Sequence, residues 1–317
     1  MIRLRLHACA KTEPYKLKRL LSLAIDTSCN WRAVAFLLLL AGQAYPVWAQ
    51  PRDNLVWLLR DLPPMTIFEG PKKGLGVIDQ LMPRIIAAMP QYDHTLMRVN
   101  RARGMQMLHD GSFTCDPSLV WTKEREKWIV FSIPAFRAVS NGLVIRKEDR
   151  PLLEPFLVGG EVDLSALLAS GDRKVGVIAE RSYGPYLDNL LQQAPQGVLT
   201  FHYGNDALGS LLQMQRLGRL QLVMGYWPEI RYQASQEHIH DNELAFFSVK
   251  GTGKYLSAYI GCSNTAEGRQ AINEINQILR SLPRDSVDRL YADWLDPDSR
   301  RDYLQDTHAF FEHQAQQ

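Results

Sequence analysis

LHDGSFTCDPSLVWTKEREKWIVFSIPAFRAVSNGLVIRK, residues 108–147, is the part of this chain from which the fold is best inferred. It reads as the end of a helix, a polar loop, a tetrapeptide at 122–125, a Phe-Ser pair and a strand at 143–145. A charged run follows at 146–150 and ends in Pro151. This change in composition indicates that the chain crosses here from one lobe into another.

Elements of alternating type flank this stretch. Before it, the apolar pattern predicts strands at 54–59 and 94–99 and helices at 77–89 and 102–109. After it, the pattern predicts strands at 175–178, 198–202 and 220–224 and helices at 183–191 and 207–217. Strands that alternate with helices indicate a mostly parallel sheet with helices on its faces.

A second crossing strand is predicted at 244–249, before a helix at 265–282 whose apolar residues share one face. We therefore expect an α/β fold with two lobes, in which the two crossing strands act as a hinge. Lobe 1 would comprise 50–143 and 250–317, and lobe 2 would comprise 147–244. Ligands of open α/β sheets bind beyond the carboxyl ends of the strands, so the loops at 61–68, 118–125, 181–184 and 225–229 should face the cleft.

Several short motifs in this order resemble the family 3 extracellular solute-binding proteins. The matching residues of the first lobe are Leu108, Gly111, Thr122, Arg125, Phe131, Ser132 and Pro134, followed by the strand at 143–146. Leu62-Pro63-Pro64 with Phe68 and Gly76 resembles the family's opening segment, and the tetrapeptide at 174–177 resembles the start of its second lobe. The resemblance implies the type 2 periplasmic-binding-protein fold, in which a bilobed receptor often captures an amino acid for an importer.

Arg125 is the sharpest candidate for a ligand contact, because a guanidinium offers a planar fork that pairs with a carboxylate through two hydrogen bonds. The resemblance implies this role for it. The alternative is an exposed arginine between two glutamates. Ser118 and Thr122 flank the same loop and offer hydroxyl or backbone donors, although Thr122 equally suits a cap for a helix that begins at Lys123.

Ser182 and Tyr183 precede a predicted helix, so their backbone N-H groups are candidates to face an anion, with an ordinary helix cap as the alternative. The remaining candidates lie on or near the expected cleft loops and are Asp61, Phe68, Trp121 and Tyr226. Aromatic faces there would stack on a cyclic or apolar part of a ligand.

The second lobe departs from the family pattern where amino-acid binders place an aspartate for the ligand's ammonium. Gly218-Arg219-Leu220 leads to Gly225 and Tyr226, and no acid follows until Glu229. Phe113 also stands where the family commonly has Asp. The α-amino-acid specificity of the family is therefore not implied for this chain.

The first 49 residues read as a leader with a signal peptide. The apolar run AVAFLLLLAG at 33–42 is followed by Val47-Trp48-Ala49, and cleavage is expected after Ala49. A membrane anchor is the alternative, but the run is shorter than the roughly 20 apolar residues of a spanning helix. Removal of the leader takes away seven Lys or Arg and two Asp or Glu and leaves 29 against 32, a net charge of −3.

Only Cys115 and Cys262 remain after the leader, in a chain expected to reach an oxidising compartment. A disulfide between them is one hypothesis, and two buried free thiols are the other. With no basic run left, no nucleic-acid partner is expected. His238 and His240 could share one face of a strand near a metal, but a solvated loop explains them as well, and no metal or cofactor is predicted.

These features predict a monomeric periplasmic receptor that captures a small anionic molecule, amino-acid-like or an organic acid, in the cleft between its lobes. Its partner would be a membrane permease of the ABC type or a sensor. An enzyme on the same fold, dehydratase-like or lytic-transglycosylase-like, is the alternative, with Asp61, Glu69 or Glu229 as its acid or base. A purely structural protein is a third possibility.

Overall fold

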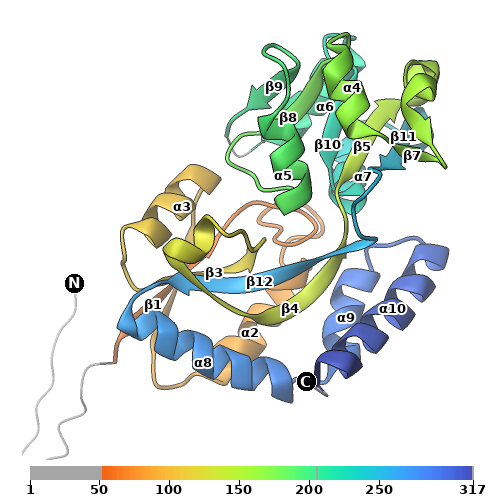
Figure 1. Ribbon diagram of the computed structural model, residues 1–317. Coiled ribbons are helices and arrows are strands. Elements are labelled where there is room, and N and C mark those ends of the chain that lie inside the picture. Colours follow the sequence, from red (N-terminus) through yellow and green to blue (C-terminus); the bar gives the residue numbers. More distant parts are fainter. Residues whose placement is uncertain (1–51, 205, 316–317) are drawn as a thin grey trace, which may run out of the picture. The chain divides into compact units, whose positions relative to one another are not determined.

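The computed structural model describes residues 52–204 and 206–315. The predicted leader, its cleavage site and its two cysteines lie outside these residues. Within them the chain forms two five-stranded sheets, one for each lobe (Figure 1). The α/β, two-lobed architecture predicted from the sequence is confirmed.

The first sheet has the strand order β2-β1-β3-β12-β4. Its strands are β1 (Asn54–Leu59), β2 (Asp93–Arg98), β3 (Thr114–Leu119), β4 (Ile129–Val139) and β12 (Tyr255–Ser263). β1 pairs in parallel with β2 and β3, whereas β12 is antiparallel to both β3 and β4. The helices that accompany this sheet are α2 (Val77–Ala87), α3 (Arg101–His109), α8 (Ala266–Ser281), α9 (Arg284–Ala292) and α10 (Pro297–Ala315).

The second sheet has the strand order β11-β5-β10-β8-β9. Its strands are β5 (Gly142–Arg146), β8 (Val175–Ile178), β9 (Leu199–His202), β10 (Leu222–Gly225) and β11 (Leu244–Ser248). The accompanying helices are α4 (Leu164–Ser170), α5 (Pro185–Gln192), α6 (Ala207–Arg216) and α7 (Trp227–Gln236). A two-stranded ribbon, β6 (Leu157–Val158) and β7 (Glu161–Val162), and the 3-10 helices η2 (Lys147–Leu152), η3 (Glu154–Phe156) and η4 (Asp241–Glu243) complete this lobe.

Alternation along β5 explains why this second sheet is covered on both faces. Leu143 and Ile145 join the apolar cluster that contains α4 and α5, and Val144 between them joins the cluster that contains α6 and α7. Successive side chains of a strand point to opposite faces, so a continuous apolar strand requires a layer of helices on each side. The first lobe has its main core around the fully buried Trp57 and Phe136.

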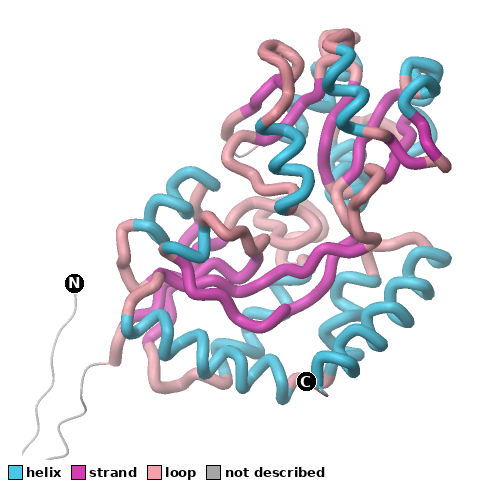
Figure 2. The backbone as a smooth tube through the Cα atoms, in the orientation of Figure 1, coloured by secondary structure: helices cyan, strands magenta, loops and turns pink. Residues whose placement is uncertain are grey.

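The chain passes between the sheets twice, from β4 to β5 and from β11 to β12. Ser140 in the first passage donates its backbone N-H to the Lys254 carbonyl oxygen in the second, at 3.1 Å. Figure 2 shows the two passages side by side where the long strands β4 and β12 leave the first sheet. The chain therefore crosses twice, as predicted, and the two strands predicted to cross are β5 and β11, which pair with each other in the second sheet.

A disulfide joins Cys115 on β3 to Cys262 on β12, and the two residues are direct partners in the strand register. No helix within 52–315, apart from the undescribed residue 205, is long and apolar enough to cross a membrane. The helix expected to begin at Lys123 is instead the single 3-10 turn η1 (Arg125–Lys127). Thr122 Oγ1 accepts the Arg125 backbone N-H at 3.2 Å, which is the bond expected of a cap.

Candidate functional site

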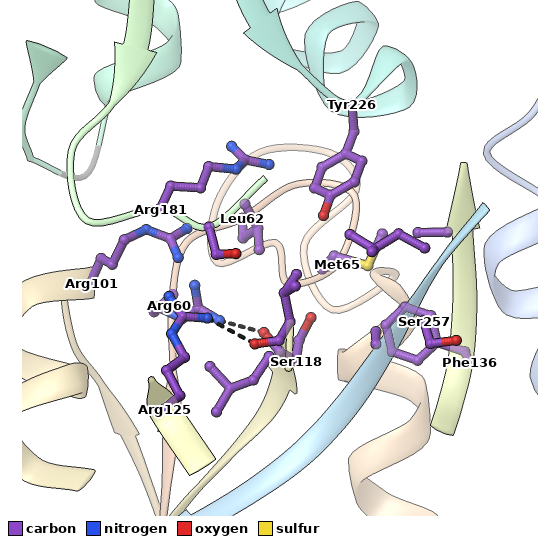
Figure 3. Close-up of a pocket in the computed structure, with 16 residues that line it drawn as sticks. Arg60, Leu62, Met65, Arg101, Ser118, Arg125, Phe136, Arg181, Tyr226 and Ser257 are labelled. Carbon is purple, nitrogen blue, oxygen red and sulfur yellow. Dashed lines mark hydrogen bonds between the residues drawn. The ribbon is translucent and has the colours of Figure 1, made fainter. Parts of the chain in front are cut away.

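A pocket lies between the two lobes, at the ends of strands β1, β3, β8 and β10 (Figure 3). The first lobe supplies most of its wall, including Arg60, Arg101, Arg125 and the Ser118–Val120 backbone, and the second lobe supplies Arg181, Ser182 and Tyr226. The space open to the centre of a water-sized sphere is about 50 Å³. Apolar side chains close the floor, and they are Leu62, Met65, Leu119, Phe136, Ala138, Leu256 and Ala258.

Four of the residues that line this pocket are arginines, and none of the described ones is an aspartate, a glutamate or a histidine. Figure 3 shows the side chains of Arg60, Arg101, Arg125 and Arg181 converging on the same space from separate elements. An arginine side chain keeps its charge at any ordinary pH and only donates hydrogen bonds. The pocket therefore has a positive wall made from both lobes.

Arg60 and Asp116 form a buried ion pair below this wall. The Arg60 Nε to Asp116 Oδ2 distance is 2.9 Å, and Arg60 Nη2 also donates to the Ser118 carbonyl oxygen at 2.6 Å. Asp116 Oδ1 in turn accepts the Ser118 backbone N-H at 2.9 Å. This network fixes the end of β3 and uses the Ser118 N-H, so the Ser118 side chain and Arg60 are the groups left for a ligand.

Arg181 and Glu229 form a second buried pair, in the other lobe. The two guanidinium nitrogens of Arg181 lie 2.9 and 2.5 Å from the two carboxylate oxygens of Glu229, with side-chain exposures of 2% and 7%. Burial lowers the pKa of Arg181, but the charge and hydrogen bonds of Glu229 outweigh burial and the net pKa is raised. The Tyr226 ring stacks on this guanidinium at 4.9 Å, so both residues are held at the pocket wall.

Arg125 lies between the lobes, and none of the described carboxylates pairs with it. Its Nη1 donates to the Val120 carbonyl oxygen at 3.0 Å, and its Nη2 reaches the Glu180 carbonyl oxygen of the second lobe at 3.5 Å. The residue is 9% exposed. Burial and the charge of Arg60 lower the pKa of Arg125, which is the behaviour of a cation with too little negative charge nearby.

Arg101, the first residue of α3, is the fourth cation of the wall. Within the described residues it has neither a hydrogen bond from its side chain nor an ion pair. Burial and the charges of Arg60, Arg181 and Arg125 lower its pKa well below that of a free guanidinium. Its donors are free to bind an incoming ligand.

The structure places the predicted site residues in three groups. Ser118, Arg125, Ser182 and Tyr226 line the pocket. Thr122 and Tyr183 line an adjoining, more open cavity, in which Tyr183 is itself buried and accepts the Ile178 backbone N-H at 2.7 Å.

Asp61, Phe68 and Trp121 do not line the pocket. Asp61 pairs with Arg98 at 2.9 Å, and the same arginine stacks on the Phe68 ring at 4.6 Å. Trp121 follows β3 on the same loop as Thr122.

The loop before α5 was expected to offer backbone donors to an anion, but two of these are already bonded. Asp188 accepts the Tyr183 N-H at 2.7 Å, and Ser182 Oγ accepts the Gly184 N-H at 3.2 Å. Ser182 Oγ also donates to Asp188 at 2.5 Å. A ligand would therefore contact this loop through the Ser182 backbone N-H and the neighbouring Arg181 side chain.

Three arginines of the wall were not among the predicted site residues. Arg60 follows strand β1 directly and Arg181 lies three residues after the end of β8, so their position near a carboxyl end was the available signal. Arg101 carries no such signal. Among the described residues, no group of three His, Cys, Asp or Glu is placed to hold a metal ion.

Neither a family model nor a curated protein matches this sequence, but many solved structures share its fold. A histidine kinase sensor domain with similarity to periplasmic binding proteins is 16% identical, with a TM-score of 0.61 over 77% of this chain and 96% of that one. An amino acid ABC transporter substrate-binding protein from Streptococcus pneumoniae, bound to L-arginine, is 17% identical, with a TM-score of 0.57 over 76% and 94%.

The VFT2 domain of BvgS from Bordetella pertussis is 17% identical, with a TM-score of 0.54 over 78% and 94% of the two chains. Likenesses at this level of identity define the class of fold. The described chain has the type 2 periplasmic-binding-protein fold, as the sequence motifs implied.

Proposed function

We propose that this protein is a periplasmic solute-binding receptor that captures a small anionic molecule between its lobes. The observation that carries the proposal is the pocket itself, which has arginines from both lobes and no described acidic residue in its wall. Such a wall binds an anion through charge-assisted hydrogen bonds. Binding from both lobes favours the closed arrangement over an open one, because only the closed form makes all the contacts.

In this proposal Arg125 is the main contact to a carboxylate. It extends from the first lobe and already reaches the Glu180 carbonyl of the second, so an anion held there would bridge the two. Ser118 adds a hydroxyl group from the first lobe, Ser182 adds its backbone N-H from the second, and Tyr226 packs over the ligand. The closed receptor would then be recognised, as a monomer, by a membrane permease of the ABC type or by a sensor, the two settings in which proteins of similar fold are found.

The contacts of the candidate acids count against the enzyme alternative. Glu229 has both oxygens paired with Arg181, and Asp61 and Glu69 both pair with Arg98. None of these three carboxylates lines the pocket. A general acid or base must reach the substrate directly or through one water molecule.

The test is thermal unfolding of the purified protein against a panel of organic acids, amino acids and sugars. A ligand at 100 times its dissociation constant should add about 2.7 kcal/mol to the free energy of unfolding. Arg125→Gln should abolish the shift caused by an acid, and Lys123→Gln, an exposed cation two residues away, should not. Stabilisation by uncharged sugars alone, or an acid response that survives Arg125→Gln, would contradict the proposal.

A further inference from the structure

The four arginines of the pocket wall differ in whether a carboxylate neutralises their charge. Arg60 and Arg181 each have a carboxylate of their own, Asp116 and Glu229, with two hydrogen bonds in each pair. Arg101 and Arg125 have no such partner among the described residues. Two positive charges therefore remain in the wall after the internal pairs are counted.

Carboxylates just outside the pocket do not remove this excess. Asp188 accepts hydrogen bonds from Ser182 and Tyr183. Asp61 is bound to Arg98. Glu229 lies close enough to Arg101 to act on its charge, but both its oxygens bind Arg181. The nearest acids are thus committed to other groups.

Unpaired guanidinium groups enclosed together are costly to a folded protein, because each is partly removed from water and repels the other. Burial and the charges of Arg60, Arg181 and Arg125 lower the pKa of Arg101 in this way, and burial and the charge of Arg60 lower the pKa of Arg125. A ligand that supplies two negative charges would satisfy both arginines at once. A ligand with one charge would leave a cation uncompensated.

The same wall is unfavourable for an ammonium group. An ammonium needs acceptors, and the described polar side chains of the wall are four arginines, three serines and the Tyr226 hydroxyl. Tyr226 follows β10 directly, in the region where the sequence lacks the acid expected of an amino-acid binder. A positive group placed there would meet Arg181, whose guanidinium packs against the Tyr226 ring.

Size adds a limit. The volume of about 50 Å³ corresponds to only a few water molecules, since one water molecule needs about 10–15 Å³ of such space. The arrangement described therefore favours a small ligand.

We infer that the pocket is specific for a small ligand with two negative charges on oxygen and without an ammonium group, such as a short dicarboxylate. The inference rests on the proposed function and specifies its ligand. Arg125 binds one anionic end and Arg101 the other, while Arg60 and Arg181 complete the positive surroundings (Figure 3). Inorganic phosphate carries the same charge in a smaller volume and is the second candidate for such a ligand.

The test is isothermal titration calorimetry of the purified protein at pH 8 with malonate, succinate, propionate, butyrate, aspartate and inorganic phosphate. Succinate or malonate should bind at least about 30-fold more tightly than butyrate or propionate, because a hydrogen-bonded charge pair contributes 10-fold or more. Aspartate, which adds an ammonium to the succinate skeleton, should bind more weakly than succinate. If phosphate binds and Arg101→Gln weakens its binding to the same extent, the requirement for two negative charges is supported and phosphate is identified as the ligand.

Arg101→Gln gives the decisive comparison. It should weaken succinate about 10- to 100-fold and change butyrate by less than about threefold, whereas Arg125→Gln should weaken both. Arg103→Gln is the matched control, since Arg103 lies on the same helix and is exposed. Thermal unfolding of each variant verifies that it is folded.

The outcomes separate this inference from the proposed function. Equal affinity for succinate and butyrate, or an Arg101→Gln protein that binds succinate as the wild type does, would overturn the inference and leave an anion receptor. Tighter binding of aspartate than of succinate would also overturn it. Failure of every anion to bind would overturn both.

Discussion

Glu229→Gln tests whether the second-lobe wall depends on its buried ion pair. The substitution keeps the shape of the side chain but removes the charge opposite Arg181, whose guanidinium is 2% exposed and bonded at 2.9 and 2.5 Å. Removal of one partner from a buried pair typically costs about 3–5 kcal/mol, because the remaining charge is left in a poorly solvated place. The amide oxygen can still accept one hydrogen bond, so we expect about 3 kcal/mol.

Urea unfolding followed by tryptophan fluorescence would measure this loss, and thermal unfolding should show a fall of about 6–12 °C in Tm for a chain of this size. Glu154→Gln is the matched control: its partner Arg150 lies 3.3 Å away and both side chains are more than half exposed, so the loss should be below about 0.5 kcal/mol. Replacement of both Arg181 and Glu229 by leucine should recover much of the stability lost by Glu229→Gln. A Glu229→Gln protein within about 1 kcal/mol of the wild type would refute this account.

Three further results are expected. The double variant Cys115→Ser, Cys262→Ser should lower the free energy of unfolding by about 3–5 kcal/mol in urea titrations, since the disulfide closes a loop of 147 residues. An unchanged midpoint of urea unfolding after reduction of the wild type would contradict this. Tyr226→Asp should weaken succinate binding at least about tenfold in calorimetry, because it places a carboxylate among the arginines; unchanged affinity would argue against a ligand at this position. Succinate affinity should be nearly constant between about pH 7 and 9, because the arginines stay charged there and no described residue of the wall is Asp, Glu or His. It should fall below about pH 5, where succinate itself takes up protons. A step in affinity near neutral pH would contradict this and indicate a titrating group in the site.

The strands that the sequence predicts best are those whose apolar runs are bounded by breaking residues. β1 and β8 have the predicted limits, Asn54–Leu59 and Val175–Ile178. β12 was not predicted, although it lies between β3 and β4 inside the first sheet. Its register shifts at Tyr259 and Gly261, and such an irregularity disrupts the two-residue alternation by which a strand is recognised.

The site shows the same limit at the level of single residues. Arg125 was found because it stands in a motif whose order could be compared with a family pattern. Arg101 and Arg103 are two arginines of one helix turn, and nothing in their spacing distinguishes them. Only the arrangement of α3 beside the end of β1 directs Arg101 to the pocket and leaves Arg103 in solvent.

The position of β12 also has a consequence for how the chain acquires its structure. The strands and helices of the second lobe, from β5 to β11, are contiguous in sequence, whereas the first sheet has β12 between β3 and β4. That sheet therefore cannot close until residues 255–263 arrive, after the whole second lobe has been synthesised. Pairings so distant in sequence are slow to form, and Cys115 must wait for Cys262 over the same interval. During synthesis, the second lobe can be complete while the first sheet still lacks its inner strand.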